Sequence, residues 1–250
     1  MSRSLVAEFL VPRQHLGPRD LHRTIRVLEA TGHTFEGGSE GAITYSGAEA
    51  RRVPAPVGEA TRALASSEEW GTLCYKPSLG GGTVEFGLSV TSPAGGPCRS
   101  VALAAEYPGA ERDSPYLLAE FVASAKLLAE LVRPWYGWVG ADVGVWGYVD
   151  REVRGAQPAA GVLEPLEWLN VYGEPFIIRY GARRLLAAPA WRTEILANGC
   201  ITVMLGSHPG TYDRGVARGV AWYLGTPEPD PEAIHPGLRH LSPFAPPGGT

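Results

Sequence analysis

The sequence predicts an α+β domain whose mainly antiparallel sheet carries helices packed on one face. Three observations lead to this expectation: a strand and an amphipathic helix open the chain, three β-compatible runs separated by glycine-rich turns follow, and an Asn-Gly turn joins two apolar runs near the C-terminus. Strands joined by short turns pair antiparallel. The order of elements suggests a single domain, residues 1–225, with two similar strand-helix-hairpin halves, 1–134 and 135–225.

The first half begins with the run SLVAEFLV, residues 4–11, which predicts a strand. Gly17-Pro18 opens a helix that Gly32 ends. Its apolar residues recur at helical spacing and are Leu21, Ile25 and Leu28. Strand and helix together form one βα unit.

A long connection and a meander follow. Residues 36–70 lack periodicity and predict an irregular connection with one short helix near 59–64. Three β-compatible runs, TLCYKP, GTVEFGLSVTSP and SVALAAEYP, then predict an antiparallel meander. The glycines 80–82 fit a hairpin turn better than a phosphate loop, because no Gly-Lys-Ser/Thr follows them.

The clearest helix of the sequence starts at Pro115, with Ser114 as its cap. A broad apolar stripe runs along it to Val132 and predicts that it packs on the sheet. Three charged residues lie mostly off this stripe and are expected on a solvated face rather than in a catalytic pair of carboxylates: Glu120, Lys126 and Glu130.

The second half opens with alternation in WVGADVGVWGYVD, residues 138–150. Valines and one alanine of one parity form an aliphatic face toward the core. The other parity carries rings, glycines and acids, which suits a protein interface; its candidate contacts are Trp138, Asp142, Trp146 and Tyr148. The alternative is that the glycines admit a closely packed helix and the tryptophan rings cover it.

A tight turn-rich segment follows, from Trp168 to Gly199. Pro175 starts a short helix with Phe176 and Tyr180 on one face, broken at Gly181 and closed by Pro189. Ahead of it lie two further candidates for a binding site, Trp168 and Asn170. The alternative is a docking corner whose polar atoms are satisfied inside the fold.

Asn198-Gly199 predicts a two-residue type I′ hairpin. Pairing about that turn places two sets of residues on opposite faces of the hairpin. One set is Arg192, Glu194, Leu196, Ile201, Val203 and Leu205; the other is Trp191, Ile195, Cys200 and Met204. Thr211 is expected to cap the last helix, which ends at Gly225, and residues 226–250 form a proline-rich tail.

Composition excludes several classes of function. The net charge of -4 lacks the basic excess of a nucleic-acid binder. No stretch approaches membrane-spanning length and no signal-peptide core is visible, so no membrane partner is expected. Three cysteines without CxxC spacing indicate neither a disulfide framework nor a zinc site and fit a cytoplasmic location.

No catalytic, metal or cofactor site can be assembled from the sequence. The six histidines are scattered and no HExxH or GxSxG motif occurs. Ser207-His208 is expected on a loop that leaves the hairpin. Asp142 and Asp150 would lie about 26 Å apart in an extended strand, too far for an acid/base pair. The chain is therefore not expected to be an enzyme.

One segment resembles a known family. Its residues are Trp168, Asn170, Tyr172-Gly173, Tyr180-Gly181, Arg184-Leu185-Leu186, Ala188-Pro189, Trp191-Arg192 and Asn198-Gly199. This run resembles the C-terminal signature of bacterial polymorphic-toxin immunity proteins, specifically the immunity protein 52 family, and related type VI secretion immunity families share part of it. The resemblance implies a cytoplasmic protein without catalysis that neutralises a cognate, co-encoded toxin by direct binding.

Two other classes of function stay open. An enzyme or small-ligand protein could form a pocket between the two halves, and a carbohydrate-binding module could use the Trp-rich strand as a stacking platform. A secreted-toxin gene directly upstream would favour immunity, whereas a metabolic operon would favour an enzyme. The sequence indicates no oligomeric state.

Overall fold

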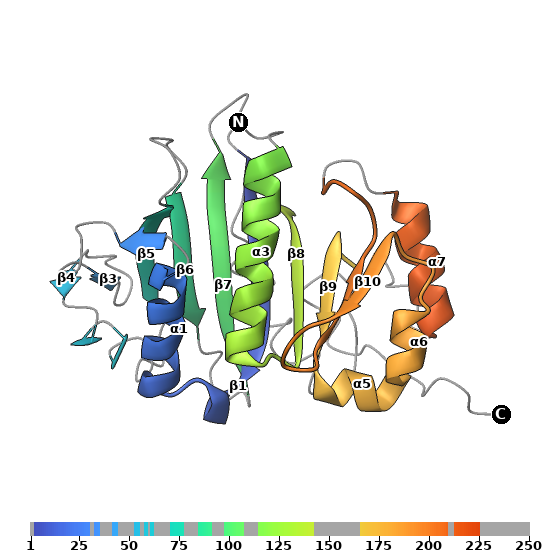
Figure 1. Cartoon of the computed structure of the whole chain (residues 1–250), viewed down its shortest axis with the longest axis horizontal. Coiled ribbons are helices and arrows are strands. Elements are labelled where there is room, and N and C mark those ends of the chain that lie inside the picture. Colours follow the sequence, from blue (N-terminus) through green and yellow to red (C-terminus); the bar gives the residue numbers. More distant parts are fainter. Residues whose placement is uncertain are drawn as a thin grey trace, which may run out of the picture.

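The computed structural model describes residues 3–30, 33–35, 42–44, 53–55, 58–59, 61–62, 71–77, 85–91, 98–107, 115–142, 166–209 and 213–225. Within these residues one antiparallel sheet has the strand order β10-β11-β9-β8-β1-β7-β6-β5-β2 (Figure 1). The α+β class and the antiparallel sheet that the sequence predicts are confirmed.

The first half supplies the centre and one end of the sheet. Strand β1 (Arg3–Pro12) pairs on one side with β7 (Cys98–Tyr107) and on the other with β8 (Tyr136–Asp142). The predicted meander is present: β5 (Gly71–Pro77), β6 (Glu85–Thr91) and β7 pair in chain order. The short strand β2 (His33–Phe35) pairs with β5 at the end of the sheet.

The long connection is more ordered than its composition suggests. Strands β3 (Ala42–Thr44) and β4 (Val53–Ala55) form a separate two-stranded sheet. Residues 58, 59, 61 and 62 are helical, close to the predicted short helix. The glycine turn at 80–82, the candidates Trp146 and Tyr148, and the tail lie outside the described residues.

One face of the sheet is covered by α1 (Pro18–Ala30), which follows the 3-10 turn η1 (Arg13–His15), and by α3 (Pro115–Val132). Alternate residues of β1, such as Phe9 and Val11, point to this face because side chains alternate along a strand. The aliphatic cluster between sheet and helices is built mainly from Leu5, Ala7, Phe9, Val11, Leu21, Ile25, Leu28, Val101, Leu103, Phe121, Leu128, Val132 and Val139.

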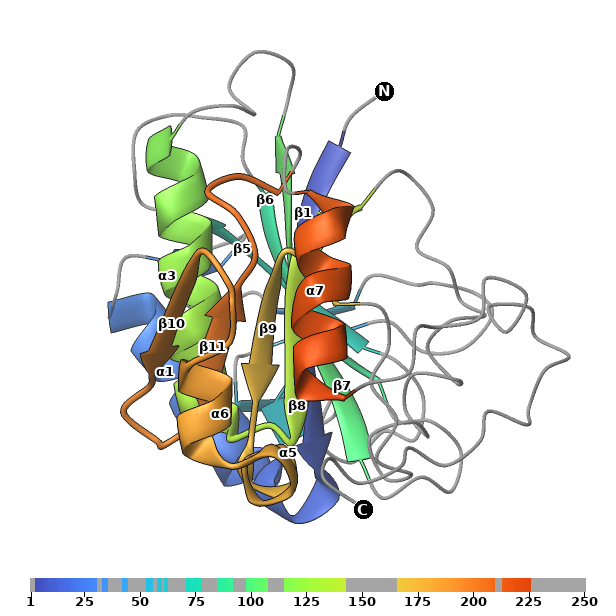
Figure 2. The ribbon, with the colours of Figure 1, turned by 90° about the vertical axis from the view of Figure 1, so that its right-hand side faces the viewer.

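The second half extends the sheet with β9 (Leu169–Tyr172), β11 (Ile201–Met204) and β10 (Arg192–Ile195). Its helices α5 (Glu174–Tyr180), α6 (Ala182–Leu186) and α7 (Arg214–Leu224) contribute to a second cluster on the opposite face. Figure 2 shows α3 and α7 on opposite sides of β8 and β9. The aromatic cluster contains Leu10, Tyr136, Tyr172, Phe176, Tyr180, Leu185, Ile201, Val203, Val220 and Leu224. The expectation that the helices pack on one face of the sheet therefore holds for α1 and α3 only.

The hairpin is present, but its predicted register is wrong by one residue. Ile195 pairs with Ile201, and the Leu196 amide donates to the Cys200 carbonyl, which leaves a three-residue loop, 197–199. Gly199 has a positive φ of 89°, whereas Asn198 does not, so the turn is not type I′. Leu196 and Cys200 consequently share the aliphatic cluster, while Ile201 and Val203 face the aromatic one.

The last helix also differs at its start. Asp213, not Thr211, is the N-cap, and its carboxylate accepts the Gly215 amide at 2.7 Å. The end is as predicted: Gly225 is left-handed, with φ 74°, and closes the helix.

Candidate functional site

The candidate residues of the second half meet where β8 joins β9. Trp138 on β8 lies opposite Asn170 on β9, and Tyr136 lies opposite Tyr172. Asp142 ends β8, and only its backbone is described. The structure therefore brings Trp138 and Asn170 together and leaves Trp146 and Tyr148 undescribed.

Asn170 is fully buried, and its amide is satisfied inside the fold. Its Oδ1 accepts the Tyr136 hydroxyl at 2.9 Å and the Glu167 amide at 3.1 Å, while its Nδ2 donates to the Glu167 carbonyl at 2.8 Å. The buried Trp168 donates Nε1–H to the Gly206 carbonyl at 2.6 Å. A partner-binding role does not fit the burial of Trp168 and Asn170; the docking corner does.

The corner closes through the backbone of Gly173. Its amide donates to the Trp135 carbonyl at 2.8 Å, and the Trp135 amide donates to the Leu10 carbonyl at 2.8 Å. A Cβ on Gly173 would lie 1.9 Å from the Pro134 carbonyl oxygen, so only glycine fits. This close approach holds the start of α5 against the loop before β8.

Two carboxylates from the two halves lie on the sheet face around Trp138. Glu8 on β1 is buried opposite Trp138 and accepts the Ser100 hydroxyl. A Cβ on Gly140 would lie 2.9 Å from Oε2 of Glu167, so that carboxylate sits directly over Gly140. The half-buried Trp138 is therefore flanked by two acidic side chains, of which Glu8 is buried and Glu167 is partly exposed.

Sequence reasoning did not place Glu8 or Glu167 at a site. Glu8 carried a signal, because a charged residue interrupts an otherwise apolar strand. Glu167 carried none, since its position depends on the pairing of β8 with β9. Within the described residues, no three His, Cys, Asp or Glu side chains come together as ligands of a metal ion.

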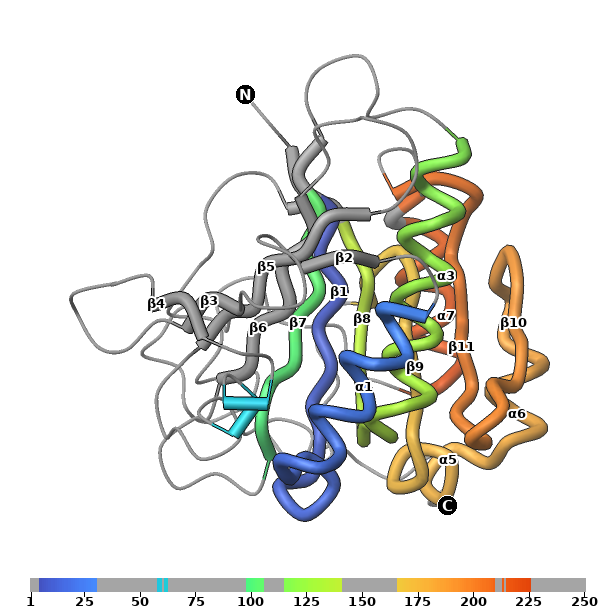
Figure 3. The backbone as a smooth tube through the Cα atoms, turned by 60° about the vertical axis from the view of Figure 1, so that its left-hand side comes forward, coloured from blue at the N-terminus to red at the C-terminus, as the bar shows by residue number. Residues whose placement is uncertain are grey.

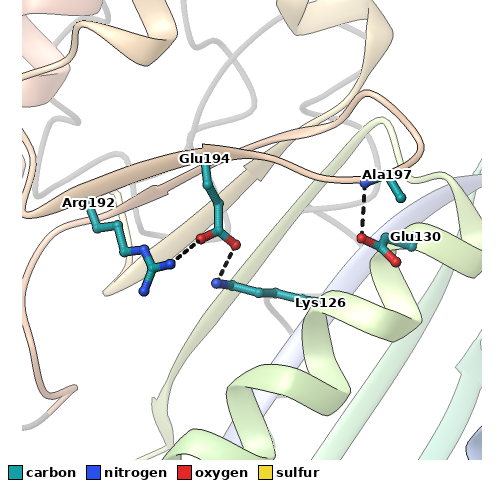
Figure 4. Close-up of polar contacts among 5 residues, drawn as sticks. All are labelled: Lys126, Glu130, Arg192, Glu194 and Ala197. Carbon is teal, nitrogen blue, oxygen red and sulfur yellow. Dashed lines mark hydrogen bonds and ion pairs between the residues drawn. The ribbon is translucent and has the colours of Figure 1, made fainter.

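Lys126 and Glu130 of α3 are not on a solvated face as predicted, because the hairpin packs on them. Figure 4 shows Lys126 paired with Glu194, which also pairs with Arg192 at 3.1 Å. The Glu130 carboxylate accepts the Ala197 amide at 3.0 Å. Asn198 adds a donated bond to the Ala129 carbonyl at 3.0 Å. Glu120, near the start of α3, is partly buried, which raises the pKa of its carboxyl.

Several large apolar side chains are exposed at the C-terminal end of the sheet. Trp191, directly before the edge strand β10, and Ile195, the last residue of that strand, are 57% and 61% exposed. Trp222 on α7 is 84% exposed. The shifted register of the hairpin decides which of its residues are open to solvent, so the predicted pairing could not identify them.

The described thiols are not poised as nucleophiles. Burial raises the pKa of both Cys98 and Cys200 to about 11, so each stays protonated at neutral pH. Ser207 and His208 lie on the loop after β11, as expected. In the described part of the chain, no helix combines the length and apolar character needed to cross a membrane.

The geometry defines an α+β protein with one long antiparallel sheet and helices on both faces. A type VI secretion (T6SS) protein of Pseudomonas aeruginosa, PA0821, has a similar fold, with a TM-score of 0.50 and 14% sequence identity over 89% of this chain and 72% of that one. At this identity the likeness shows the fold alone. No family model and no curated protein matches the sequence.

Proposed function

We propose that this chain is an immunity protein that neutralises a cognate bacterial toxin by binding it directly, without catalysis. The observation that carries the proposal is the fold shared with a T6SS protein over 89% of the chain. The turn and packing motifs from Trp168 to Gly199 support it independently, because they resemble the C-terminal signature of immunity families.

The toxin-binding surface centres on Trp138. The ring is half-buried, which is typical of an aromatic anchor that is held by its own fold and completed by a partner. The carboxylate of Glu167 beside it complements a basic toxin surface. This surface lies on the face of the sheet opposite α3, because Trp138 packs against the aromatic cluster.

The test uses the product of the gene directly upstream as the candidate toxin. Bacteria that produce this toxin are expected to survive only when the chain is produced with it, and calorimetry is expected to show a direct complex. Trp138→Ala should weaken the complex by about 2 kcal/mol, or about 30-fold in Kd. Glu167→Gln should weaken it less and mainly at low salt.

Trp222→Ala is the matched control, since it removes a tryptophan from α7 that is largely exposed. It should leave both toxin affinity and the free energy of unfolding unchanged within about 0.5 kcal/mol. Survival without the chain, or protection with no complex between folded proteins, contradicts the proposal. Equal affinity in wild type and folded Trp138→Ala contradicts this surface.

A further inference from the structure

Strand β10 forms one end of the sheet. Among the described residues β10 pairs only with β11, and it lies at the margin of the sheet in Figure 3. The Leu196 amide donates to the Cys200 carbonyl, which makes 196/200 a hydrogen-bonded pair. Hydrogen-bonded and non-bonded pairs alternate in antiparallel ladders, so the N–H and C=O groups of Thr193 and Ile195 point away from β11.

The side chains along this edge are exposed as well. Arg192 is 60% exposed, and Trp191 and Ile195 are similarly open. An exposed edge with apolar side chains readily pairs with another strand, and proteins usually shield such edges with charges, prolines or bulges. The strand is short, but no proline interrupts Trp191 to Ile195. Its short length and its charged residues Arg192 and Glu194 are protective features, but these two charges have opposite signs and can attract their counterparts on a second strand.

We propose that β10 binds β10 of a second copy of this chain, antiparallel and centred on Thr193. The sequence WRTEI is complementary to itself in this register. Thr193 meets Thr193 of the second copy through the outward-pointing backbone groups, Trp191 meets its Ile195, and Arg192 meets its Glu194. Aromatic–aliphatic and opposite-charge pairs are favourable cross-strand combinations. The Thr193 hydroxyl already donates to the Leu186 carbonyl at 2.9 Å, so the Thr193 pair contributes through its backbone.

The charges favour this register over its neighbour. Lys126, Arg192 and Glu194 already form a cluster with one excess positive charge in each chain. Pairing centred on Thr193 brings a second arginine to each Glu194. Pairing centred on Glu194 would place the two glutamates opposite each other, which is unfavourable.

The dimer is separate from the toxin surface, because β9 and β11 lie between β8 and β10. It therefore goes beyond the proposed function and does not depend on it. Pairing of five residues buries far less than the 1,200 Å² or so of a standard stable interface. Association should accordingly be weak and rise with concentration between about 10 µM and about 1 mM.

Charge-reversal variants of the full chain test the contact, and sedimentation equilibrium measures their association. When each variant is studied without the other, Arg192→Glu and Glu194→Arg both place like charges across the proposed interface, so the association constant of each should fall at least about tenfold. Glu194→Arg is made together with Lys126→Glu, which preserves the ion pair with α3 in reverse. An equimolar mixture of the two variants should restore association, because each Glu now meets an Arg.

Cross-linking tests the register in a background without Cys74. Thr193→Cys should form a disulfide between copies, because the two residues face each other at the centre. Ile195→Cys is the control, since its two copies would lie more than about 13 Å apart. A chain that stays monomeric at about 1 mM, charge variants that associate like wild type, or cross-linking through position 195 rather than 193 would each overturn the proposal.

Discussion

The aliphatic and aromatic clusters lie on opposite faces of one sheet but are held together differently. In the aliphatic cluster, mostly aliphatic side chains, together with the rings of Phe9, Phe121 and Trp168, fill the space between the sheet and two helices. In the aromatic cluster, rings contact one another in defined pairs: Tyr136 and Phe176 are 5.5 Å apart between centroids, and Phe176 and Tyr180 are stacked at 6.2 Å.

The difference shows which interactions depend on direction. Burial of apolar area is non-directional and tolerates exchange of residues with similar volume. Ring pairs and buried hydroxyls require particular distances and partners. Small changes in backbone position should therefore damage the aromatic cluster more than the aliphatic one.

The largest expected effect is at the corner that positions the aromatic cluster. Gly173→Ala would place a methyl group 1.9 Å from the Pro134 carbonyl oxygen, which the backbone cannot accommodate without moving β9 or α5. The free energy of unfolding should fall by about 3 kcal/mol or more. Chemical denaturation measures it.

The control is Gly219→Ala on α7, where a new Cβ meets nothing within 4 Å. Because alanine favours the helix, this variant should be as stable as wild type or gain up to about 1 kcal/mol. A Gly173→Ala protein within about 1 kcal/mol of wild type would show that the corner is more plastic than its geometry implies.

The next expected effect is on the pH dependence of the free energy of unfolding, to which the two clusters contribute through different groups. Burial raises the pKa of Cys200, in the aliphatic cluster, to about 11, above its value in the unfolded chain. Between about pH 9 and pH 11 the unfolded state therefore loses this proton first, and stability falls with rising pH by up to about 2–3 kcal/mol. Burial also raises the pKa of Tyr172, in the aromatic cluster, so this hydroxyl lowers the stability only above about pH 10, where tyrosine in the unfolded chain ionises.

Urea midpoints measured from pH 8 to pH 11 check this expectation. Cys200→Ala should be less stable at neutral pH because it leaves a small cavity, but its stability should decline less steeply above pH 9. Identical slopes in wild type and variant would rule out this thiol as the cause.

The smallest effects concern two hydroxyl groups within the aromatic cluster. Tyr136 donates to Asn170, whereas the buried Tyr172 hydroxyl has no hydrogen-bond partner among the described residues. Tyr136→Phe should therefore lose about 1 kcal/mol, and Tyr172→Phe should be neutral or gain about 1 kcal/mol. Thermal and urea unfolding of both variants measure the sign, and equal losses would contradict the assigned hydrogen bonds.

Local patterns predicted most elements but not the candidate site. A mostly apolar run located β1, alternation located β8, and helical spacing located α1, α3 and the Phe176–Tyr180 face. Trp168 and Asn170 were candidate contacts because no local pattern shows that they lie where β9 runs between β8 and β11. The burial of residues on and beside β9 depends on its two neighbouring strands, β8 and β11, which are distant along the chain.

What the sequence by itself determined is the class of the domain, the order of its elements and most of their ends, because period, turn chemistry and capping act over a few residues. Tertiary structure decided the hairpin register, since Asn198 bonds to the Ala129 carbonyl 69 positions away. It also decided that Glu167 reaches Gly140 and that β10 is the end strand of the sheet among the described residues. These features follow from contacts between distant segments, which no local pattern records.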